Sequence, residues 1–314
     1  MWAYIFRKLI YNVPVYLTIV LLVMAALRVH DPVYSYLGKN AKPEDIVKYR
    51  ELGGLDQPLL VQYTRFLTTF DLGTESWDQR GRTVGEILRT SVGPSLAITV
   101  PALLLTTLIS ICVGIISSYY RGRLVDRTLV VMAVLGMSVS FLVYIILGQY
   151  FGAYVLNRSL GRELFAIEGY EPGLANWAHY CLLPVIISVI VGMGYDTRYY
   201  RAVMVEESQR DYIVTALAKG ASKRKGMCVH MLKNAMIPIV TRGAISLPFL
   251  IMGSILLESF FGIPGMGRTL IAAVRVKDFP VVQAFTAIFA LVYIFTIILT
   301  DVLYALFDPR VRLS

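Results

Sequence analysis

Charged residues are scarce in this chain. They make up 16% of its 314 residues, while hydrophobic residues make up 56%. An average soluble domain has about 25% charged and about 45–50% apolar residues. The apolar residues also come in long uncharged blocks, which indicate a bilayer as solvent. This composition excludes an ordinary soluble enzyme.

Cysteine and histidine are rare as well, with three residues of each. No two cysteines have C-x-x-C spacing, so the three thiols predict neither a disulfide framework nor a zinc site. The histidines, His30, His179 and His230, lie far apart in the sequence. We therefore expect no metal site in this chain.

A phosphate-binding loop of the form G-x-x-x-x-G-K-[ST] is missing from the sequence. The only Gly-Lys pair, Gly38-Lys39, is followed by Asn40. We therefore expect no cofactor in this chain, and any ATP hydrolysis must come from other chains.

The apolar blocks are long enough to cross a membrane. A helix rises about 1.5 Å per residue, so about 20 residues cross a hydrocarbon layer of about 30 Å. Five uncharged segments reach this length: Leu9 to Leu27, Thr90 to Tyr120, Thr128 to Asn157, Pro172 to Tyr195 and Phe279 to Thr300. A sixth, Ala235 to Leu257, contains one charge, Arg242, which lies one turn after Pro238 and can snorkel to the interface. Backbone groups in hydrocarbon must bond within their own segment, so the sequence predicts an all-α polytopic membrane protein of six transmembrane helices.

The first segment is preceded by Arg7 and Lys8, as in a secretory signal. It is longer than a usual signal core and has no convincing small-residue cleavage site. We therefore expect a permanent membrane anchor.

Basic residues predict the orientation of the chain. With both termini on one side, that side holds 16 Lys and Arg against 7 Asp and Glu, and the other side holds 14 of each. The whole net charge of +9 then lies on one face, which we expect to be cytosolic. This topology explains the positive net charge, so the charge need not indicate nucleic-acid binding. No basic patch interleaved with aromatic residues argues for nucleic acid either.

The predicted spans divide the chain into four segments. Residues 1–27 hold the N-terminus and first transmembrane helix, 28–90 a helical extracytoplasmic loop, 91–306 a five-helix core and 307–314 a cytosolic tail. In the extracytoplasmic loop we expect one helix from Pro43 to Gly53 and a second capped by Asp56. A third should begin at a capping box formed by Thr83 and Glu86.

The core includes a cytosolic segment, residues 206–236, that alternates helix and glycine. Tyr212, Ile213, Ala216 and Leu217 form an apolar stripe at helical spacing. Gly220 fits a left-handed helix stop, and Ser222 fits the cap of the next helix. Lys219 and the run Lys223-Arg224-Lys225 flank this turn. The pattern predicts an amphipathic helix–Gly–helix unit that either docks a cytosolic partner or lies on anionic lipid.

An outer Gly/Pro loop, residues 258–280, closes the core. Three glycines and one proline within Glu258 to Gly267 predict that this stretch cannot continue a helix. Its apolar residues, Phe260, Phe261, Ile263 and Met266, favour a hairpin that dips toward the membrane. A plain turn in solvent fits the spacing about as well.

Two residue pairs keep an intramembrane protease open as an alternative. Asp196 and Asp301 could pair as acid and base, or His179 could activate Ser138. The two aspartates fit interfacial anchors or salt bridges between helices better. A secondary transporter is the other alternative, although no internal repeat supports it.

Residues 211–241 resemble the inner-loop signature of ABC-importer permeases, specifically the dipeptide/oligopeptide/nickel branch. That signature reads D-Y-[IV]-x-T-A-x-A-K-G followed by H-x-L-[KR]-N-A-[LM]-[IL]-P. The chain has DYIVTALAKG at 211–220 and HMLKNAMIP at 230–238. Other stretches that resemble this branch are GLDQPLLVQY at 54–63, DLGTE at 71–75, FFGIPGMGRTL at 260–270, DFPVVQA at 278–284 and DVLYALFDPRVR at 301–312.

The resemblance implies a type I ABC-importer permease fold with both termini in the cytosol of a prokaryotic cell, in its inner membrane. It implies half of a translocation path for di- or oligopeptides, or for nickel, with a second homologous permease as the other half. Two cytosolic ABC ATPase subunits, which bind ATP and Mg, and an extracytoplasmic solute-binding protein are the other implied partners.

The resemblance also leads us to expect two groups of functional residues and no catalytic ones. The coupling residues, which would contact the ATPases from the coupling segment 206–236, are Tyr212, Thr215, Ala216, Ala218, Lys219, Gly220, Ala221 and Ser222. The gate residues of the outer loop are Phe260, Phe261, Gly262, Pro264, Gly265 and Gly267. ATP-driven closure of the ATPases would move the helix–Gly220–helix unit as a rigid lever.

Overall fold

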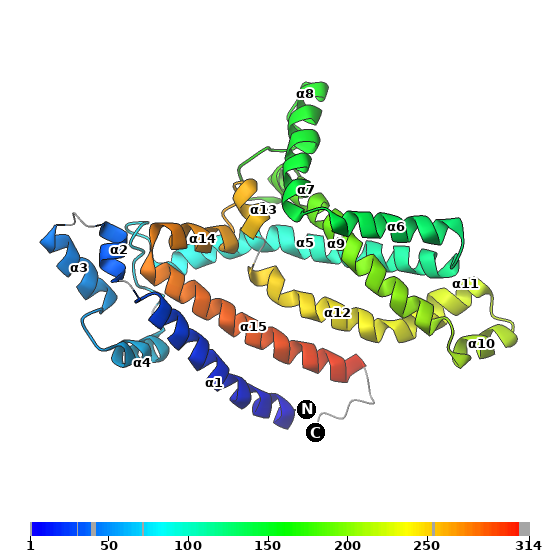
Figure 1. The fold of residues 1–314 in the computed structure, drawn as a ribbon, viewed down its shortest axis with the longest axis horizontal. Coiled ribbons are helices and arrows are strands. Elements are labelled where there is room, and N and C mark those ends of the chain that lie inside the picture. The colour runs from blue at the N-terminus through cyan, green and yellow to red at the C-terminus, as the bar shows by residue number, and fades with distance from the viewer. Residues whose placement is uncertain (1, 30, 39–41, 71, 253–254, 308–314) are drawn as a thin grey trace. The chain divides into compact units, whose positions relative to one another are not determined.

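The computed structural model describes residues 2–29, 31–38, 42–70, 72–252 and 255–307, which form helices joined by turns and loops (Figure 1). The helices up to residue 160 are α1 (Trp2–Ala26), α2 (Pro32–Leu37), α3 (Pro43–Gly53), α4 (Leu59–Thr69), α5 (Val84–Tyr119), α6 (Leu124–Ser138), α7 (Phe141–Leu147), the π-helix η1 (Gly148–Val155) and α8 (Leu156–Leu160). The later ones are α9 (Leu174–Glu207), α10 (Asp211–Ala218), α11 (Lys223–Lys225), the π-helix η2 (Gly226–Met231), α12 (Leu232–Met252), α13 (Ile255–Phe260), α14 (Met266–Val276) and α15 (Phe279–Phe307). The predicted all-α class is confirmed.

Four helices in the described part of the chain are long and apolar enough to cross a membrane. They cover Phe6–Ala26, Val84–Tyr119, Leu174–Glu207 and Phe279–Val302, and the pair Leu124–Ser138 and Phe141–Leu160 can supply a fifth span. These agree with five of the predicted spans. The remaining one, Ala235 to Leu257, falls on α12 and α13, but residues 253–254 lie outside the described residues, as do residues 308–314 of the expected tail. The count of six spans and the side of the termini stay predictions.

The uninterrupted apolar run of the third predicted span suggested one straight helix, but the structure has a bend there. α6 and α7 meet at an angle of 92°, and Val139 between them has extended backbone. The Oγ of Ser138 donates to the carbonyl four residues earlier at 2.7 Å, a contact that often bends helices. Across the bend, the Tyr144 hydroxyl donates to Gly136 O at 2.9 Å. Polar groups therefore stabilise a bend that apolar periodicity does not reveal.

Contacts divide the chain into two compact units. One comprises Met1–Leu96, Ile251–Ser259 and Ile263–Ile298, and the other comprises Ala97–Leu250, Phe260–Gly262 and Leu299–Ser314. Each unit combines stretches that are distant in the sequence. The division into four segments stays a prediction.

The first unit contains the helices of the predicted extracytoplasmic loop. α3 spans Pro43–Gly53 as expected. The capping box is confirmed, because Thr83 N donates to Glu86 Oε2 and Glu86 N donates to Thr83 Oγ1, both at 3.2 Å. The helix it opens continues without a break into the second predicted span. α4 forms where expected, but no side chain caps it, so the predicted cap by Asp56 is wrong.

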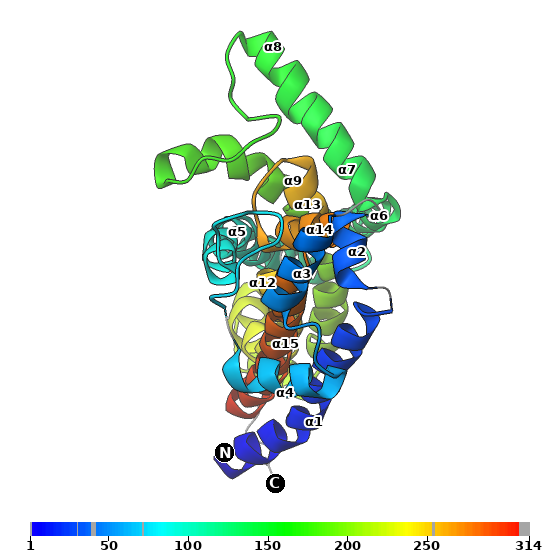
Figure 2. The same ribbon diagram turned by 90° about the vertical axis from the view of Figure 1, so that its left-hand side faces the viewer.

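α4 lies against α1 (Figures 1 and 2). The Tyr63 hydroxyl donates to Leu17 O at 2.9 Å. Val20 and Met24 of α1 are buried among apolar side chains that include Phe66. The loop helix is thus packed onto the first span instead of extending into solvent.

A buried carboxylate joins the extracytoplasmic loop to the start of α15. Asp278 accepts hydrogen bonds from Ser76 Oγ at 2.5 Å and from the backbone N of Trp77 and Asp78, each at 3.3 Å. The Trp77 ring stacks on Phe279 with centroids 5.7 Å apart. A negative charge at the first residues of a helix also complements its dipole. Asp278 therefore connects the extracytoplasmic loop to the start of α15.

In the second unit, α6 packs against α9 at Gly194. A Cβ at this position would lie 2.9 Å from Met137 N and 3.1 Å from Ala133 O. The missing side chain thus allows the two backbones to approach closely.

Candidate functional site

The coupling segment folds around Gly220 as the sequence predicted. α10 ends two residues earlier, and Gly220 has a φ of +88°, in the left-handed region. Ala221 N donates to Ala216 O at 3.1 Å, which closes the turn. Ser222 then caps α11, since its Oγ accepts a hydrogen bond from Lys225 N at 3.3 Å. The predicted helix–Gly–helix unit is present.

Gly220 is required within this chain for its conformation alone. No atom of the described residues, apart from its neighbours, lies within 4 Å of the position that a Cβ would take. A side chain in the left-handed region costs about 1–2 kcal/mol. The space beside Gly220 is open, so a partner can approach the backbone there.

One face of the coupling segment is buried. Its residues join a cluster, called the coupling cluster, that consists of Tyr200, Met204, Ile213, Met227, Met231, Ala235 and Ile239. Ile213 comes from α10, and Tyr200 and Met204 come from the last turns of α9. The Tyr212 hydroxyl donates to Glu207 Oε2 at 2.5 Å. Burial and this bond raise the pKa of Tyr212 to about 12, so the phenol keeps its proton, and α10 is held on the end of α9.

The opposite face exposes apolar side chains. Val214 is 60% exposed, Leu217 42% and Val229 53%. Leu217 belongs to the predicted apolar stripe, yet it lies outside the coupling cluster. Exposed apolar groups beside lysines fit a surface that a partner covers. Among the coupling residues, Thr215, Ala218, Lys219, Gly220 and Ser222 are exposed, and Tyr212, Ala216 and Ala221 are partly buried.

Lys223, one of the basic residues beside this turn, is held by the chain itself. Its Nζ donates to Tyr119 O at 2.9 Å and lies 4.4 Å from the centroid of the Tyr119 ring. This contact links α11 to the end of α5.

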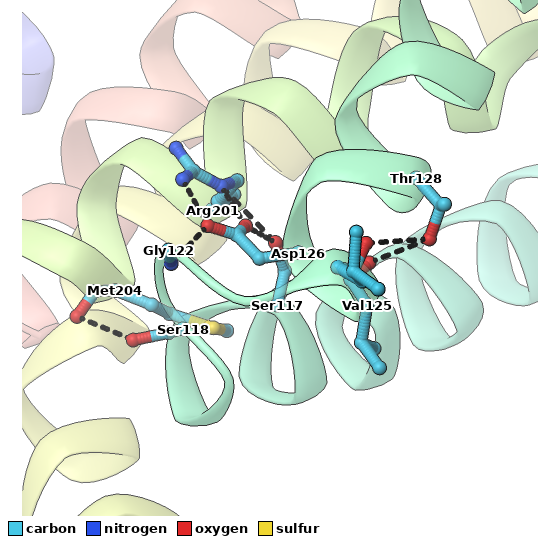
Figure 3. A network of polar contacts seen from close by, with 9 residues as sticks. Ser117, Ser118, Gly122, Val125, Asp126, Thr128, Arg201 and Met204 are labelled. Atoms are coloured by element: carbon cyan, nitrogen blue, oxygen red, sulfur yellow. Dashed lines mark hydrogen bonds and ion pairs between the residues drawn. The ribbon is translucent and has the colours of Figure 1, made fainter.

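A charged network fixes the helices that carry the coupling segment (Figure 3). Arg201 Nε and Nη2 donate to the two oxygens of Asp126 at 2.7 and 2.8 Å. Ser117 Oγ donates to Asp126 Oδ1 at 2.5 Å, and Gly122 N donates to Oδ2 at 2.9 Å. The carboxylate is buried, and this two-point geometry is the strong form of an arginine pair. The α5–α6 turn is thereby locked to α9.

Sequence reasoning missed this network. Asp126 and Arg201 are 75 residues apart, and each resembles an ordinary cytosolic charge near a span. Asp126 faces Ser117 because of the turn between α5 and α6. The sequence from Arg123 to Arg127 does not reveal the geometry of that turn. No local signal identifies the pair.

Arg242 is paired and does not simply snorkel as expected. Its Nε lies 3.1 Å from Asp196 Oδ1, and its guanidinium lies 5.7 Å from the Tyr199 ring centroid. The pair joins α12 to α9. The interpretation of Asp196 as part of a salt bridge between helices is confirmed.

The outer Gly/Pro loop is more helical and more buried than predicted. Helix α13 continues through Glu258, and α14 begins at Met266, so only the turn between them breaks the helical path. Glu258 is fully buried and accepts hydrogen bonds from Ser95 Oγ at 2.7 Å and from Arg268 N at 2.9 Å. Ser95 Oγ in turn accepts from Met266 N at 2.8 Å. A buried carboxylate organises this turn, which the glycine and proline pattern did not reveal.

The gate residues differ in burial. Phe261, Gly265 and Gly267 are buried, Gly262 is partly buried, and Phe260 and Pro264 are exposed. Ile263 and Met266 between them are also buried. The alternative of a plain turn in solvent is therefore wrong, and the favoured partial burial is confirmed. Whether the loop acts as a gate stays a prediction.

Two backbone contacts hold the aromatic end of the loop. Gln149 Nε2 donates to Phe260 O at 2.9 Å, and Gly169 N donates to Phe261 O at 2.8 Å. Gly262 has a φ of +68°, and a Cβ there would lie 2.5 Å from Glu168 Cγ. Only glycine fits this position without displacing its neighbour.

Three residues of the protease alternative contact groups other than their proposed catalytic partners. Ser138 donates to its own helix, and His179 Nδ1 lies 3.1 Å from Leu164 O. Asp196 is paired with Arg242. The described ranges contain no group of three or more His, Cys, Asp or Glu side chains that could hold a metal ion.

Comparisons with known proteins identify the family that the chain resembles. Residues 110–313 match the family model of the binding-protein-dependent transport system inner membrane component. The chain is 33% identical over 322 residues to a glutathione transport system permease protein of Salmonella paratyphi A, and 34% identical to that of Pectobacterium atrosepticum. It is 32% identical over 324 residues to a putative peptide transport system permease protein of Brucella abortus. Each alignment covers 99% of both chains.

Proposed function

Since the chain belongs to the family of binding-protein-dependent transport system inner membrane components, we propose that it forms half of a path through which small peptides enter the cytoplasm. The chain is a multi-pass membrane permease of such an importer and a transport subunit, not an enzyme. This family membership replaces the intramembrane protease and secondary transporter alternatives.

Small peptides are the proposed solute because of the relatives. The relatives that align along almost their whole length are named as glutathione or peptide transport permeases. Glutathione is itself a tripeptide, so both names describe one chemical class. Nickel, the other solute of the branch that the sequence resembles, is not named by these relatives.

The proposed assembly has five components. A second homologous permease forms the other half of the path, two ABC ATPase subunits dock on the cytosolic face, and a solute-binding protein delivers peptide from outside. The chain lies in a bacterial inner membrane with both termini in the cytosol. The missing phosphate-binding loop supports this division of labour, because nucleotide binding must then reside in other chains.

Coupling is proposed to act through the exposed face of α10 and α11. The observation that carries this proposal is that Val214 and Leu217 face solvent while Ile213 of the same helix is buried in the coupling cluster. An ATPase that grips the exposed face therefore pulls on the buried face. The Asp126–Arg201 network passes this movement to the α5–α6 turn, because two-point ion pairs resist rotation.

The outer loop is proposed to act as the gate. Gln149 Nε2 and Gly169 N donate hydrogen bonds to its aromatic end, and the Glu258 carboxylate accepts a hydrogen bond from Arg268 N after its glycine end. Such a turn can move as a unit when the helices that hold it shift. Its buried aromatic ring, Phe261, is the group most suited to closing a path.

The experiment is uptake into proteoliposomes by the complete transporter with its binding protein. We expect uptake of labelled glutathione or a dipeptide that needs ATP inside the cytosolic compartment. Gly220→Trp should abolish both uptake and co-purification of the ATPases, since a bulky side chain fills the open approach to the backbone. Gly161→Trp is the matched control, because this glycine also has positive φ and open space around it but lies far from the coupling segment in sequence.

Three outcomes contradict the proposal. Uptake driven by an ion gradient without ATP would remove the coupling mechanism. Equal loss of ATPase binding in Gly220→Trp and Gly161→Trp would show a general folding defect in place of a docking surface. ATP-driven uptake of nickel without peptide uptake would overturn the solute class.

A further inference from the structure

The first unit contains a cavity of about 140 Å³ beside the end of α1. Its walls come from α1, α3, α4 and the start of α15, together with Thr74 and Val84. Two arginines, Arg28 and Arg65, and two glutamines, Gln62 and Gln283, contribute to its lining, which includes no acidic residue.

Arg28 is held in place by Gln62. The Gln62 amide is buried, and its Nε2 donates to the carbonyls of Leu55 and Gln57. This fixes the orientation of the amide, so that Oε1 accepts a hydrogen bond from Arg28 Nη2. The guanidinium also lies over the Phe279 ring, 5.3 Å from its centroid. The side chain is therefore positioned before any ligand arrives.

The positive charge of Arg28 has no counter-charge in the described residues. Its Nε and Nη1 are buried and have no hydrogen-bond partner there. Burial lowers the pKa of the Arg28 guanidinium, as expected for a cation removed from water without an anion beside it. Buried charges in proteins are normally paired. No described residue supplies an anion for the buried Nε and Nη1 atoms, and the adjoining cavity is where a ligand could supply one.

Two further groups in the cavity wall match an anion. Gln283 is only 7% exposed, and no hydrogen bond to its amide occurs within the described ranges. Arg65 forms no ion pair with a described carboxylate, and its Nη1 would lie 3.4 Å from a Cβ at Gly54. The second guanidinium therefore lies beside the backbone of Gly54, which also lines the cavity.

We propose that this cavity binds the carboxylate of a transported peptide. This inference rests on the proposed function and adds a residue-level determinant of the solute. A carboxylate supplies the missing negative charge and two acceptor oxygens, one for Arg28 and one for Arg65 or Gln283. The lining includes two arginines and no acidic residue, so the proposed contact is with the carboxylate end of the solute.

The test compares dialanine with dialanine amide on the complete transporter in nanodiscs, without ATP and without binding protein. We expect the free acid to bind at least tenfold more tightly than the amide. Arg28→Gln should reduce this ratio to near one, Arg28→Lys should retain part of it, and Arg65→Gln should lower it. Arg80→Gln is the matched control, because it removes the same charge from an exposed position of the same loop outside the cavity.

Arg65 is exposed, so Arg65→Gln tests the cavity even if Arg28→Gln disturbs folding. Equal affinities for acid and amide in the unchanged transporter would overturn the proposal, as would an unchanged ratio in both arginine variants. A third overturning result is that Arg28→Gln binds both peptides normally but loses stimulation of ATP hydrolysis by the binding protein. The cavity would then serve an acidic side chain of that protein.

Failure of the inference is distinguishable from failure of the proposed function. ATP-driven peptide uptake by the unchanged transporter, measured in proteoliposomes, tests the function alone. A transporter that takes up dialanine and its amide equally well retains the function and refutes the carboxylate site.

Discussion

Glu258 and Gly265 lie so close that a methyl group on residue 265 would meet the Glu258 carboxylate at 2.3–2.5 Å. Gly265 has a φ of −84°, so its role is to leave space and not to adopt an unusual conformation. The buried carboxylate occupies the volume that any other residue would need. The turn of the outer loop is thus built from an acid and a glycine together.

Gly265→Ala should therefore disturb the outer loop. Forcing an extra methyl group into a packed site costs about 1–3 kcal/mol, and we expect a lower unfolding temperature in detergent and slower peptide uptake. Gly93→Ala is the control, because no atom lies within 4 Å of its Cβ position and alanine suits a helix interior better. A Gly265→Ala transporter with unchanged stability and uptake would show that the carboxylate moves freely.

Asp126→Asn should destabilise the second unit. Removing one partner of a buried ion pair costs about 3–5 kcal/mol, and we expect the lower end because the Arg201 side chain is 27% exposed. The loss should appear in thermal unfolding and in ATPase activity coupled to peptide. Arg210→Gln removes the arginine of an exposed pair with Glu206 and should change stability by less than about 1 kcal/mol. Similar effects of both variants would refute the structural role of the network.

The two faces of α10 should respond differently to substitution. Ile213→Ala deletes a buried side chain of the coupling cluster and should cost about 2–5 kcal/mol of stability. Val214→Ser with Leu217→Ser changes exposed positions, which usually alter stability by about 0.5 kcal/mol or less, but should weaken ATPase binding. Co-purification of the ATPases and thermal unfolding, measured on both variants, separate the effects. Loss of stability without loss of binding in the serine variant would contradict the docking surface.

Asp278→Asn should loosen the extracytoplasmic loop. Hydrogen bonds to a charged group contribute about 1.5–3 kcal/mol, and the amide cannot accept all those that Asp278 receives from Ser76, Trp77 and Asp78. We expect faster limited proteolysis and faster hydrogen exchange around residues 76–79. Asp78→Asn alters an exposed carboxylate of the same turn and should leave both rates unchanged. Equal rates of proteolysis and hydrogen exchange in the two variants would refute the role of Asp278 in holding the loop.

Local sequence signals predicted local structure well. The Thr83/Glu86 box, the helix beginning at Pro43 and the Gly220 to Ser222 turn each depend on residues within a few positions of one another. Apolar blocks predicted the long helices for the same reason, since about 20 consecutive residues suffice to define a span. The sequence therefore indicated most helices and the geometry of the coupling segment.

The polar contacts that fix the helices were not predictable. Ser95 and Glu258 are 163 residues apart, and Ser76 and Asp278 are 202 apart. Each pairing depends on how distant helices meet, which no local pattern states. The bend after Ser138 was missed because it depends on hydrogen bonds of the Ser138 and Tyr144 hydroxyls. The apolar residues around them predict a helix and do not reveal a bend.

Asp278 has a consequence for engineering chimaeras of this transporter. The amide groups of residues 77 and 78 belong to the first loop, but the oxygens they bind are encoded some 200 residues later. Grafting that loop from a relative would import donors without their acceptor unless the graft also carried the segment before α15. A functional exchange therefore has to replace two segments together, the first loop and the segment before α15.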